Sequence, residues 1–138
     1  MDDLEANKAI VREFLDALGQ GDRARVAAVL DRDCRAIATG TSVLSGERDY
    51  DGVLATVDML GSATQNGIAF SIISMTAEQN RVSVETEGRS TLASGQPYNN
   101  QYHFLFHMRA GRIIELKEYF CTKLVEELLV PMQSTGQP

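Results

Sequence analysis

The chain has 138 residues, of which 43% are hydrophobic and 23% are charged, and its formal net charge at pH 7 is −6. This length and composition are typical of one globular domain with its own hydrophobic core. The acidic balance, without a cluster of Lys or Arg, argues against nucleic acid and against an anionic membrane surface as partners, because both require concentrated positive charge.

Cysteine content and the N-terminal sequence bear on the cellular compartment. Cys34 and Cys121 are too few for a disulfide framework and lack the spacing of metal ligands. The N-terminal sequence MDDLEANKAI is acidic and amphipathic, unlike a signal peptide, and the longest apolar runs are far short of a membrane span. We therefore expect a cytoplasmic protein with reduced thiols.

The first part of the chain predicts a helical hairpin. Apolar residues recur at helical spacing over residues 4–18, after Asp2 and Asp3, which are placed to cap a helix. Gly19-Gln20-Gly21 interrupts this pattern. Asp22 then restarts a shorter helix with three apolar residues on one side: Val26, Val29 and Leu30.

A short strand and a third helix follow. The sequence CRAIAT over residues 34–39 indicates the strand, and a loop rich in Gly, Ser and Thr covers residues 40–46. Residues 50–60 carry apolar side chains at helical spacing, and Gly61 is expected to end that helix.

From there the apolar pattern changes to a period of two, which predicts four consecutive antiparallel strands. They are expected near residues 68–72, 82–84, 98–109 and 112–120. A last helix is expected after Thr122 as its cap, with Pro131 stopping it. We expect one domain over residues 1–130 and a tail over residues 131–138.

This element order predicts an α+β fold in which the helical hairpin and the third helix pack on a curved, mostly antiparallel sheet. A sheet that curls around helices leaves a blind cavity where the two layers diverge. A ligand site is expected there.

The chain resembles the SnoaL-like, or polyketide-cyclase-like, branch of the nuclear-transport-factor-2-like (NTF2-like) and ketosteroid-isomerase-like superfamily. The resemblance extends over nearly the whole chain in element order. It is sharpest between Gly95 and Val125, in the motifs G-x-P-Y-N-N-x-Y-H-F, R-x-G-R-I and K-E-Y-x-x-T. It implies a cone-shaped fold, a homodimer formed through the sheet face, and activities that include isomerases, dehydratases, lyases and aldol-type cyclases as well as non-catalytic binding modules.

Two departures from the family pattern concern catalytic aspartates. In the SnoaL-like pattern the last strand ends E-Y-x-D-T, and Cys121 stands at the position of that aspartate. In the isomerases an aspartate lies on the short strand after the hairpin, whereas here that strand is CRAIAT, without a carboxylate. The chain is therefore not a plain copy of either enzyme type.

Four residues are candidates for catalysis. Glu87 would face the cavity if Val82 and Val84 face solvent or a dimer partner, and burial would then raise the pKa of its carboxyl; the alternative is a solvated strand face. His103 could shuttle protons, or lie on the sheet surface. Its neighbour Tyr102 could, together with Tyr119, donate hydrogen bonds to an oxyanion, or both could be core tyrosines.

Other residues are expected to contact a substrate. Tyr98 and Asn100 lie on the same strand face as Tyr102, and Tyr50 opens the third helix near the expected cavity mouth. Cys121 shares a strand face with Tyr119 and is expected to be a small wall residue of the cavity; the other reading is a thiol nucleophile or base.

We found no cofactor motif and no metal-ligand pattern, since His103 and His107 are about 13 Å apart along a strand. The sequence favours a cofactor-independent proton-transfer enzyme acting on a small apolar molecule, aromatic or polyketide-like. The alternative is a non-catalytic ligand-binding module or dimeric scaffold.

Overall fold

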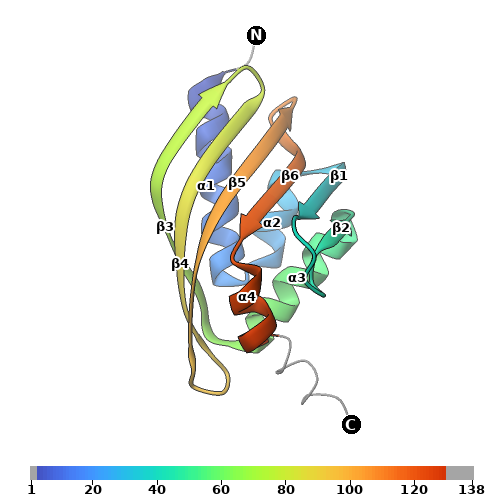
Figure 1. Cartoon of the computed structure of the whole chain (residues 1–138). Coiled ribbons are helices and arrows are strands. Elements are labelled where there is room, and N and C mark those ends of the chain that lie inside the picture. The colour runs from blue at the N-terminus through green and yellow to red at the C-terminus, as the bar shows by residue number, and fades with distance from the viewer. Residues whose placement is uncertain (1–2, 130–138) are drawn as a thin grey trace.

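The computed structural model describes residues 3–129, which form one layer of helices on one curved sheet (Figure 1). The helices are α1 (Leu4–Gln20), α2 (Arg23–Val29), α3 (Tyr50–Ala63) and α4 (Thr122–Leu124), and a π-helical turn, η1 (Val125–Leu129), follows α4. The strands are β1 (Leu30–Ala38), β2 (Gly46–Arg48), β3 (Thr64–Glu78), β4 (Arg81–Leu92), β5 (Pro97–Arg109) and β6 (Arg112–Phe120).

The six strands lie in the order β2-β1-β6-β5-β4-β3. All neighbouring pairs are antiparallel except β1 and β6, which are parallel. The expected α+β arrangement, with a helical hairpin and a third helix on a curved, mostly antiparallel sheet, is confirmed. None of the helices within residues 3–129 is long and apolar enough to cross a bilayer.

The helical hairpin has the expected N-caps and the expected glycine turn. The carboxylate of Asp3 accepts a hydrogen bond from the amide of Ala6 at 3.0 Å, and that of Asp22 accepts one from the amide of Arg25 at 3.2 Å. Between the two helices, Gly21 adopts a left-handed conformation with φ of 69°. The sequence therefore specifies both helix starts and the turn.

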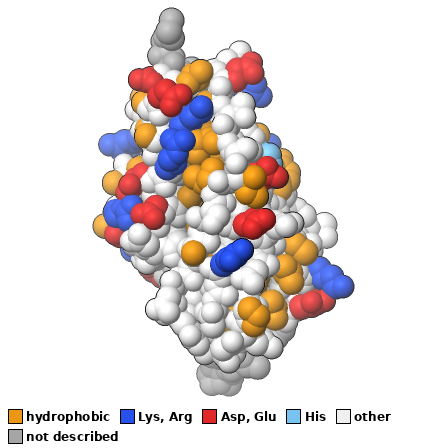
Figure 2. All heavy atoms as spheres, turned by 90° about the vertical axis from the view of Figure 1, so that its left-hand side faces the viewer, with side chains coloured by type: hydrophobic (Ala, Val, Ile, Leu, Met, Phe, Trp, Pro, Cys, Tyr) orange, Lys and Arg blue, Asp and Glu red, His pale blue; other side chains and the backbone are white. Residues whose placement is uncertain are grey.

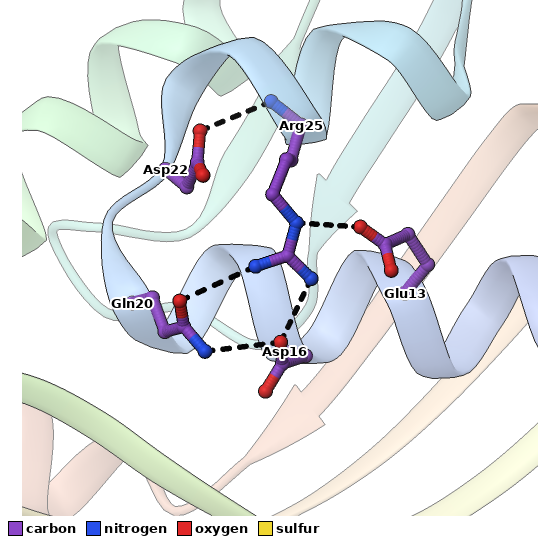
Figure 3. Close-up of polar contacts among 5 residues, drawn as sticks. All are labelled: Glu13, Asp16, Gln20, Asp22 and Arg25. Atoms are coloured by element: carbon purple, nitrogen blue, oxygen red, sulfur yellow. Dashed lines mark hydrogen bonds and ion pairs between the residues drawn. The ribbon is translucent and has the colours of Figure 1, made fainter.

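Arg25 links α2 to α1 through polar contacts (Figure 3). Its guanidinium donates hydrogen bonds to Glu13 at 2.6 Å, to Asp16 at 2.7 Å and to Gln20 at 3.3 Å. These contacts raise the pKa of Arg25 above its usual value and lower the pKa of the Glu13 carboxyl. The polar cluster holds α2 in place beside the sheet-facing helix.

The core lies between α1 and the inner face of the sheet. Val82 and Val84 of β4 are fully buried, as is Phe106 of β5. The ring of Phe106 meets that of Phe14 from α1 edge to face, with centroids 5.5 Å apart. The period-two pattern thus assigns one face of β4 and β5 to the core.

Four local expectations were wrong. Gly61 lies inside α3, which continues to Ala63, because an isolated glycine in a helix is a modest penalty rather than a stop. Leu30 begins β1 instead of ending a helix, and the three-residue strand β2 was not predicted. The cap of α4 is Cys121, not Thr122, and it forms no side-chain hydrogen bond as a cap. Pro131 and the tail over residues 131–138 lie outside the described residues.

Two glycines bring the end of α1 against the start of β3. A Cβ atom on Gly19 would lie 2.2 Å from the carbonyl oxygen of Ile68, and one on Gly67 would lie 2.0 Å from the carbonyl oxygen of Gly19. Only glycine fits at either position. This approach places Ile68 and Phe70 beneath α1, where they form one wall of a cavity.

Candidate functional site

A cavity of about 120 Å³ opens between the inner face of the sheet and the helices. Strands β1, β2, β3, β5 and β6 contribute to it, together with α1, α3 and η1. Most of its lining is apolar. Its polar lining side chains are Arg48, Thr56, Tyr98, Tyr102 and Glu118.

Glu118 supplies the carboxylate of this cavity. It lies on β6 between Leu116 and Phe120, which also line the cavity, so all three follow the two-residue period of the strand. Thr39 fixes the backbone there, donating hydrogen bonds from its amide at 3.0 Å and its hydroxyl at 2.8 Å to the carbonyl oxygen of Glu118. The side chain is half-buried and lines the cavity.

Burial raises the pKa of the Glu118 carboxyl from its usual 4.5 to about 7. The charge of Arg48 acts in the opposite direction and is the smaller effect. Arg48 lines the same cavity and donates a hydrogen bond to the carbonyl oxygen of Leu44 at 2.8 Å. Near neutral pH this carboxyl is therefore present in both its protonated and its ionised form.

Two tyrosines of β5 provide phenol groups to the cavity. Tyr98 and Tyr102 are both buried and both line it, as expected from the sequence. Burial raises the pKa of each phenol, and the negative charge of Glu118 raises both further. Both groups therefore remain protonated hydrogen-bond donors across the physiological pH range.

Asn100 is hydrogen-bonded to Tyr98 and does not itself line the cavity. Its side-chain amide donates to the hydroxyl of Tyr98 at 3.0 Å and to the carbonyl oxygen of Cys121 at 3.3 Å. Its carbonyl accepts a hydrogen bond from the amide of Cys121 at 3.3 Å. Asn100 thus orients Tyr98 and ties the end of β6 to β5.

Three of the expected catalytic residues lie on the other side of the sheet. Glu87, His103 and Tyr119 are on the outer face, and the side chain of Tyr119 is 44% exposed. For Glu87 and His103 the structure gives the alternative of a solvated strand face that the sequence left open, since Val82 and Val84 take the inner positions of β4. The expectation that Tyr119 lies in the cavity or in the core was wrong. His103 instead accepts or donates a hydrogen bond with Ser83 on this outer face, at 2.6 Å between Nε2 and Oγ.

Besides Asn100, two more of the expected substrate contacts, Tyr50 and Cys121, are absent from the cavity lining. Cys121 does share the orientation of Tyr119, but both are exposed, and Cys121 borders an outer groove with Glu87. Tyr50 packs against the core, and the guanidinium of Arg32 lies 4.3 Å from its ring centroid. Of the eight expected site residues, the structure brings Tyr98, Asn100 and Tyr102 together.

The sequence did contain a signal for Glu118. In a regular strand it points away from Tyr119, so an outward Tyr119 implies an inward Glu118. Arg48 had no comparable signal, because it lies on a three-residue strand within a loop-like stretch.

The cavity can therefore exchange protons and stabilise negative charge on oxygen. Glu118 can accept or donate a proton near neutral pH, and the two phenols can hydrogen-bond a carbonyl or an enolate oxygen. Within residues 3–129, no three His, Cys, Asp or Glu side chains gather in a way that could hold a metal ion. The absence of a cofactor remains a prediction from the sequence.

Comparison with known proteins gives a family and a fold. The sequence profile of the SnoaL-like domain family matches residues 11–116. None of the curated proteins compared with the chain matches it.

Many solved structures are similar to it. One is Bal32a from a soil-derived mobile gene cassette, with 18% identity, a TM-score of 0.80, and coverage of 92% of this chain and 98% of that chain. PrhC from Penicillium brasilianum NBRC 6234 has 15% identity, a TM-score of 0.84, and coverage of 96% and 91%. An NTF2-like protein of unknown function from Burkholderia pseudomallei K96243 has 20% identity, a TM-score of 0.77, and coverage of 89% and 96%. At these identities the likeness shows the fold alone, and it confirms the expected NTF2-like cone.

Proposed function

Because the chain belongs to the SnoaL-like domain family, whose fold alone does not specify a reaction, we propose a function from the chemistry of the cavity. The protein is a cofactor-independent enzyme that moves a proton on a small, mostly apolar carbonyl compound, aromatic or polyketide-like. The observation that carries this proposal is a carboxyl with a pKa of about 7, Glu118, inside an apolar cavity that two phenols share.

Glu118 is the acid and base in this proposal. A general base works best when its pKa lies near the working pH, because it can then take up a proton in one step and return it in the next. The apolar lining provides this condition, since burial is the main cause of the raised pKa. The ionised carboxylate would remove a proton next to a substrate carbonyl.

Tyr98 and Tyr102 stabilise the oxygen that becomes negative in that step. A hydrogen bond from Asn100 holds the phenol of Tyr98, and the ring of Tyr102 is stacked on that of Phe104 with centroids 5.5 Å apart, so little reorganisation accompanies the reaction. Arg48 lines the same cavity and contributes a fixed positive charge. Isomerisation, elimination and aldol-type ring closure all require this combination of a base and an oxyanion site.

The cavity volume restricts the substrate. An apolar cavity of about 150 Å³ takes up a benzene molecule, and the cavity here is about 120 Å³. We therefore expect the group bound beside Glu118 to be no larger than one six-membered ring.

The test uses a one-ring ketone with a mobile double bond. Cyclohex-3-enone becomes cyclohex-2-enone when a proton leaves the carbon beside the carbonyl and another is added at the far end of the double bond, and ultraviolet absorbance follows the change. We expect the chain to catalyse this reaction and Glu118→Gln to lower the rate about 100-fold or more. Glu87→Gln, which removes the same charge from the outer face, should leave the rate unchanged. A Glu118→Gln variant with the wild-type rate would refute the assignment.

Non-catalytic binding is the second candidate, and the predominantly apolar lining favours it. It predicts that cyclohex-2-enone binds in the cavity, as seen by shifts of the Tyr98 and Tyr102 resonances, while neither ketone is converted faster than in buffer.

A further inference from the structure

Strand β3 forms one edge of the sheet and lacks the usual protection of an edge. Within residues 3–129 it pairs with β4 alone, so its other side presents unpaired backbone groups. No charged residue and no proline occurs from Thr64 to Ala77. Four consecutive residues, Ser71 to Ser74, are exposed, and the side chains of Ile72 and Ile73 are 38% and 55% exposed. Figure 2 faces this side of the molecule and shows hydrophobic side chains in its upper half, between groups of charged ones.

An irregularity of β3 falls in the middle of this exposed stretch. Ile72 is opposite Thr86 of β4, whereas Ser74 is opposite the preceding residue, Glu85, so β3 contains one extra residue at Ile73. Such a bulge reverses which face the following side chains occupy.

The side-chain positions around the bulge confirm this reversal. Phe70 lines the cavity and Met75 packs on the core, so both are on the inner face although five positions separate them. Ser71 is opposite Glu87 on the outer face, and Ser74 is hydrogen-bonded to Glu85 there, at 3.2 Å. Without the bulge, residues an odd number apart would lie on opposite faces.

The sequence around the bulge reads nearly the same in both directions: Phe-Ser-Ile-Ile-Ser-Met, residues 70–75. Consider a second copy whose β3 runs antiparallel to this one, with a two-fold axis between Ile72 and Ile73. Phe70 then lies opposite Met75 of the second copy, Ser71 opposite Ser74, and Ile72 opposite Ile73. Because of the bulge, the two residues in each of these pairs lie on one face: Phe70 and Met75 on the inner face, and Ser71 and Ser74 on the outer face. Antiparallel partners must share a face in this way.

We propose that the β3 edge is a self-complementary interface through which two copies of this chain join their sheets. The contact is isologous, as a two-fold dimer requires. It places apolar side chains opposite each other on the inner face and hydroxyl groups opposite each other on the outer face. From Ile68 to Ala77 it opposes no two like charges, and it satisfies backbone groups that are otherwise unpaired.

A bulge can also protect an edge by twisting it away from a partner. Here the strand itself carries no charge and no proline from Thr64 to Ala77, although Arg12 and Asp16 of α1 border the same groove as Ile68 and Ile72, and the position of the bulge makes the two halves of the edge match. A homodimer through the sheet face, expected from the family resemblance, is the competing prediction, and the experiments below distinguish the two.

Disulfide trapping tests the pairing directly. In a Cys121→Ser background, chains carrying Ser71→Cys are mixed with chains carrying Ser74→Cys and oxidised. Directly opposite Cβ atoms in a sheet are about 4.5–5.5 Å apart, close to what a disulfide spans. We expect a disulfide between positions 71 and 74 in the mixture and none when either variant is oxidised alone. Cross-linking of the Ser71→Cys chain with itself would overturn the proposed register.

Sedimentation of the full chain over a range of concentrations tests the assembly. We expect the wild type to dimerise reversibly and Ile73→Lys to be monomeric with an unchanged circular dichroism spectrum. Val43→Lys, which removes another exposed hydrophobic side chain away from the edge, should remain dimeric, and so should Tyr119→Lys on the outer face. A monomeric wild type would overturn the proposal, as would a dimer lost in Tyr119→Lys and kept in Ile73→Lys.

Discussion

Replacing Glu118 with glutamine should change how the stability of the protein depends on pH. In the unfolded chain a Glu carboxyl ionises near pH 4.5, whereas burial in the cavity raises the pKa of Glu118 to about 7 in the folded state. Between these values the folded state keeps a proton that the unfolded state releases, so stability falls as pH rises from 4.5 to 7. Each pH unit corresponds to about 1.36 kcal/mol, and the ionised group therefore costs the folded state about 3 kcal/mol above pH 7.

Glutamine has the shape of the protonated acid and does not ionise. We therefore expect Glu118→Gln to match the wild type near pH 4.5 and to exceed its free energy of unfolding by about 3 kcal/mol at pH 8. Urea denaturation followed by circular dichroism at pH 5, 6, 7 and 8 measures the difference. Glu87→Gln is the control for the loss of one charge and should not open a gap that widens with pH. If the two curves stay parallel from pH 5 to pH 8, the buried-carboxyl interpretation is wrong.

Further predictions concern two glycines and the two thiols. A Cβ atom on Gly88 would lie 2.8 Å from the ring of Tyr102, so Gly88→Ala should destabilise the protein by about 1–3 kcal/mol and weaken binding of one-ring ligands. Gly61→Ala, where a Cβ atom meets nothing within 4 Å inside α3, should instead stabilise by about 0.5–1 kcal/mol, and thermal unfolding compares the two. Burial raises the pKa of the Cys34 thiol to about 11, while Cys121 is exposed. Ellman's reagent at pH 8 should label one thiol per folded chain, and labelling of both at similar rates would contradict the placement of Cys34.

Much of the fold could be predicted because its signals are local. Asp3, Asp22 and Gly21 mark the ends of the hairpin helices through short-range hydrogen bonds and a left-handed turn. The change of apolar period from that of a helix to two separates α3 from the strands that follow. The three-residue strand β2 was missed because it exists only through its pairing with β1 over residues 36–38.

The face of each strand was harder to predict than its existence. Alternation shows that Val82 and Val84 lie on the opposite face of β4 from Glu85 and Glu87, but it does not say which face is buried. Of the two placements left open for Glu87, the solvated strand face is the one observed, since the hydrophobic effect places the valines in the core. On β5 the same rule gave the correct answer for Tyr98 and Tyr102, because those tyrosines alternate with polar residues.

Glu118 was missed because its neighbour Tyr119 was expected to face the cavity, which places Glu118 outside, and because a general rule argues against a buried carboxylate. Charged side chains are rarely placed among Leu and Phe, and a glutamate between Leu116 and Phe120 violates the pattern. Positions where local rules fail are often functional sites, because a raised pKa is useful there and unfavourable elsewhere. A carboxylate among apolar residues on the buried face of a strand is therefore a better sign of a functional site than a tyrosine or histidine in a motif.

The most direct test of the account is the pH dependence of kcat/KM for cyclohex-3-enone, measured from pH 5 to pH 9. This quantity reports the ionisation of the free enzyme. We predict that it rises with pH to a plateau with a midpoint near 7, the pKa of Glu118, and that the rise disappears in Glu118→Gln. A profile that is flat across this range, or a midpoint near 7 that persists in Glu118→Gln, would contradict the assignment of Glu118 as the base.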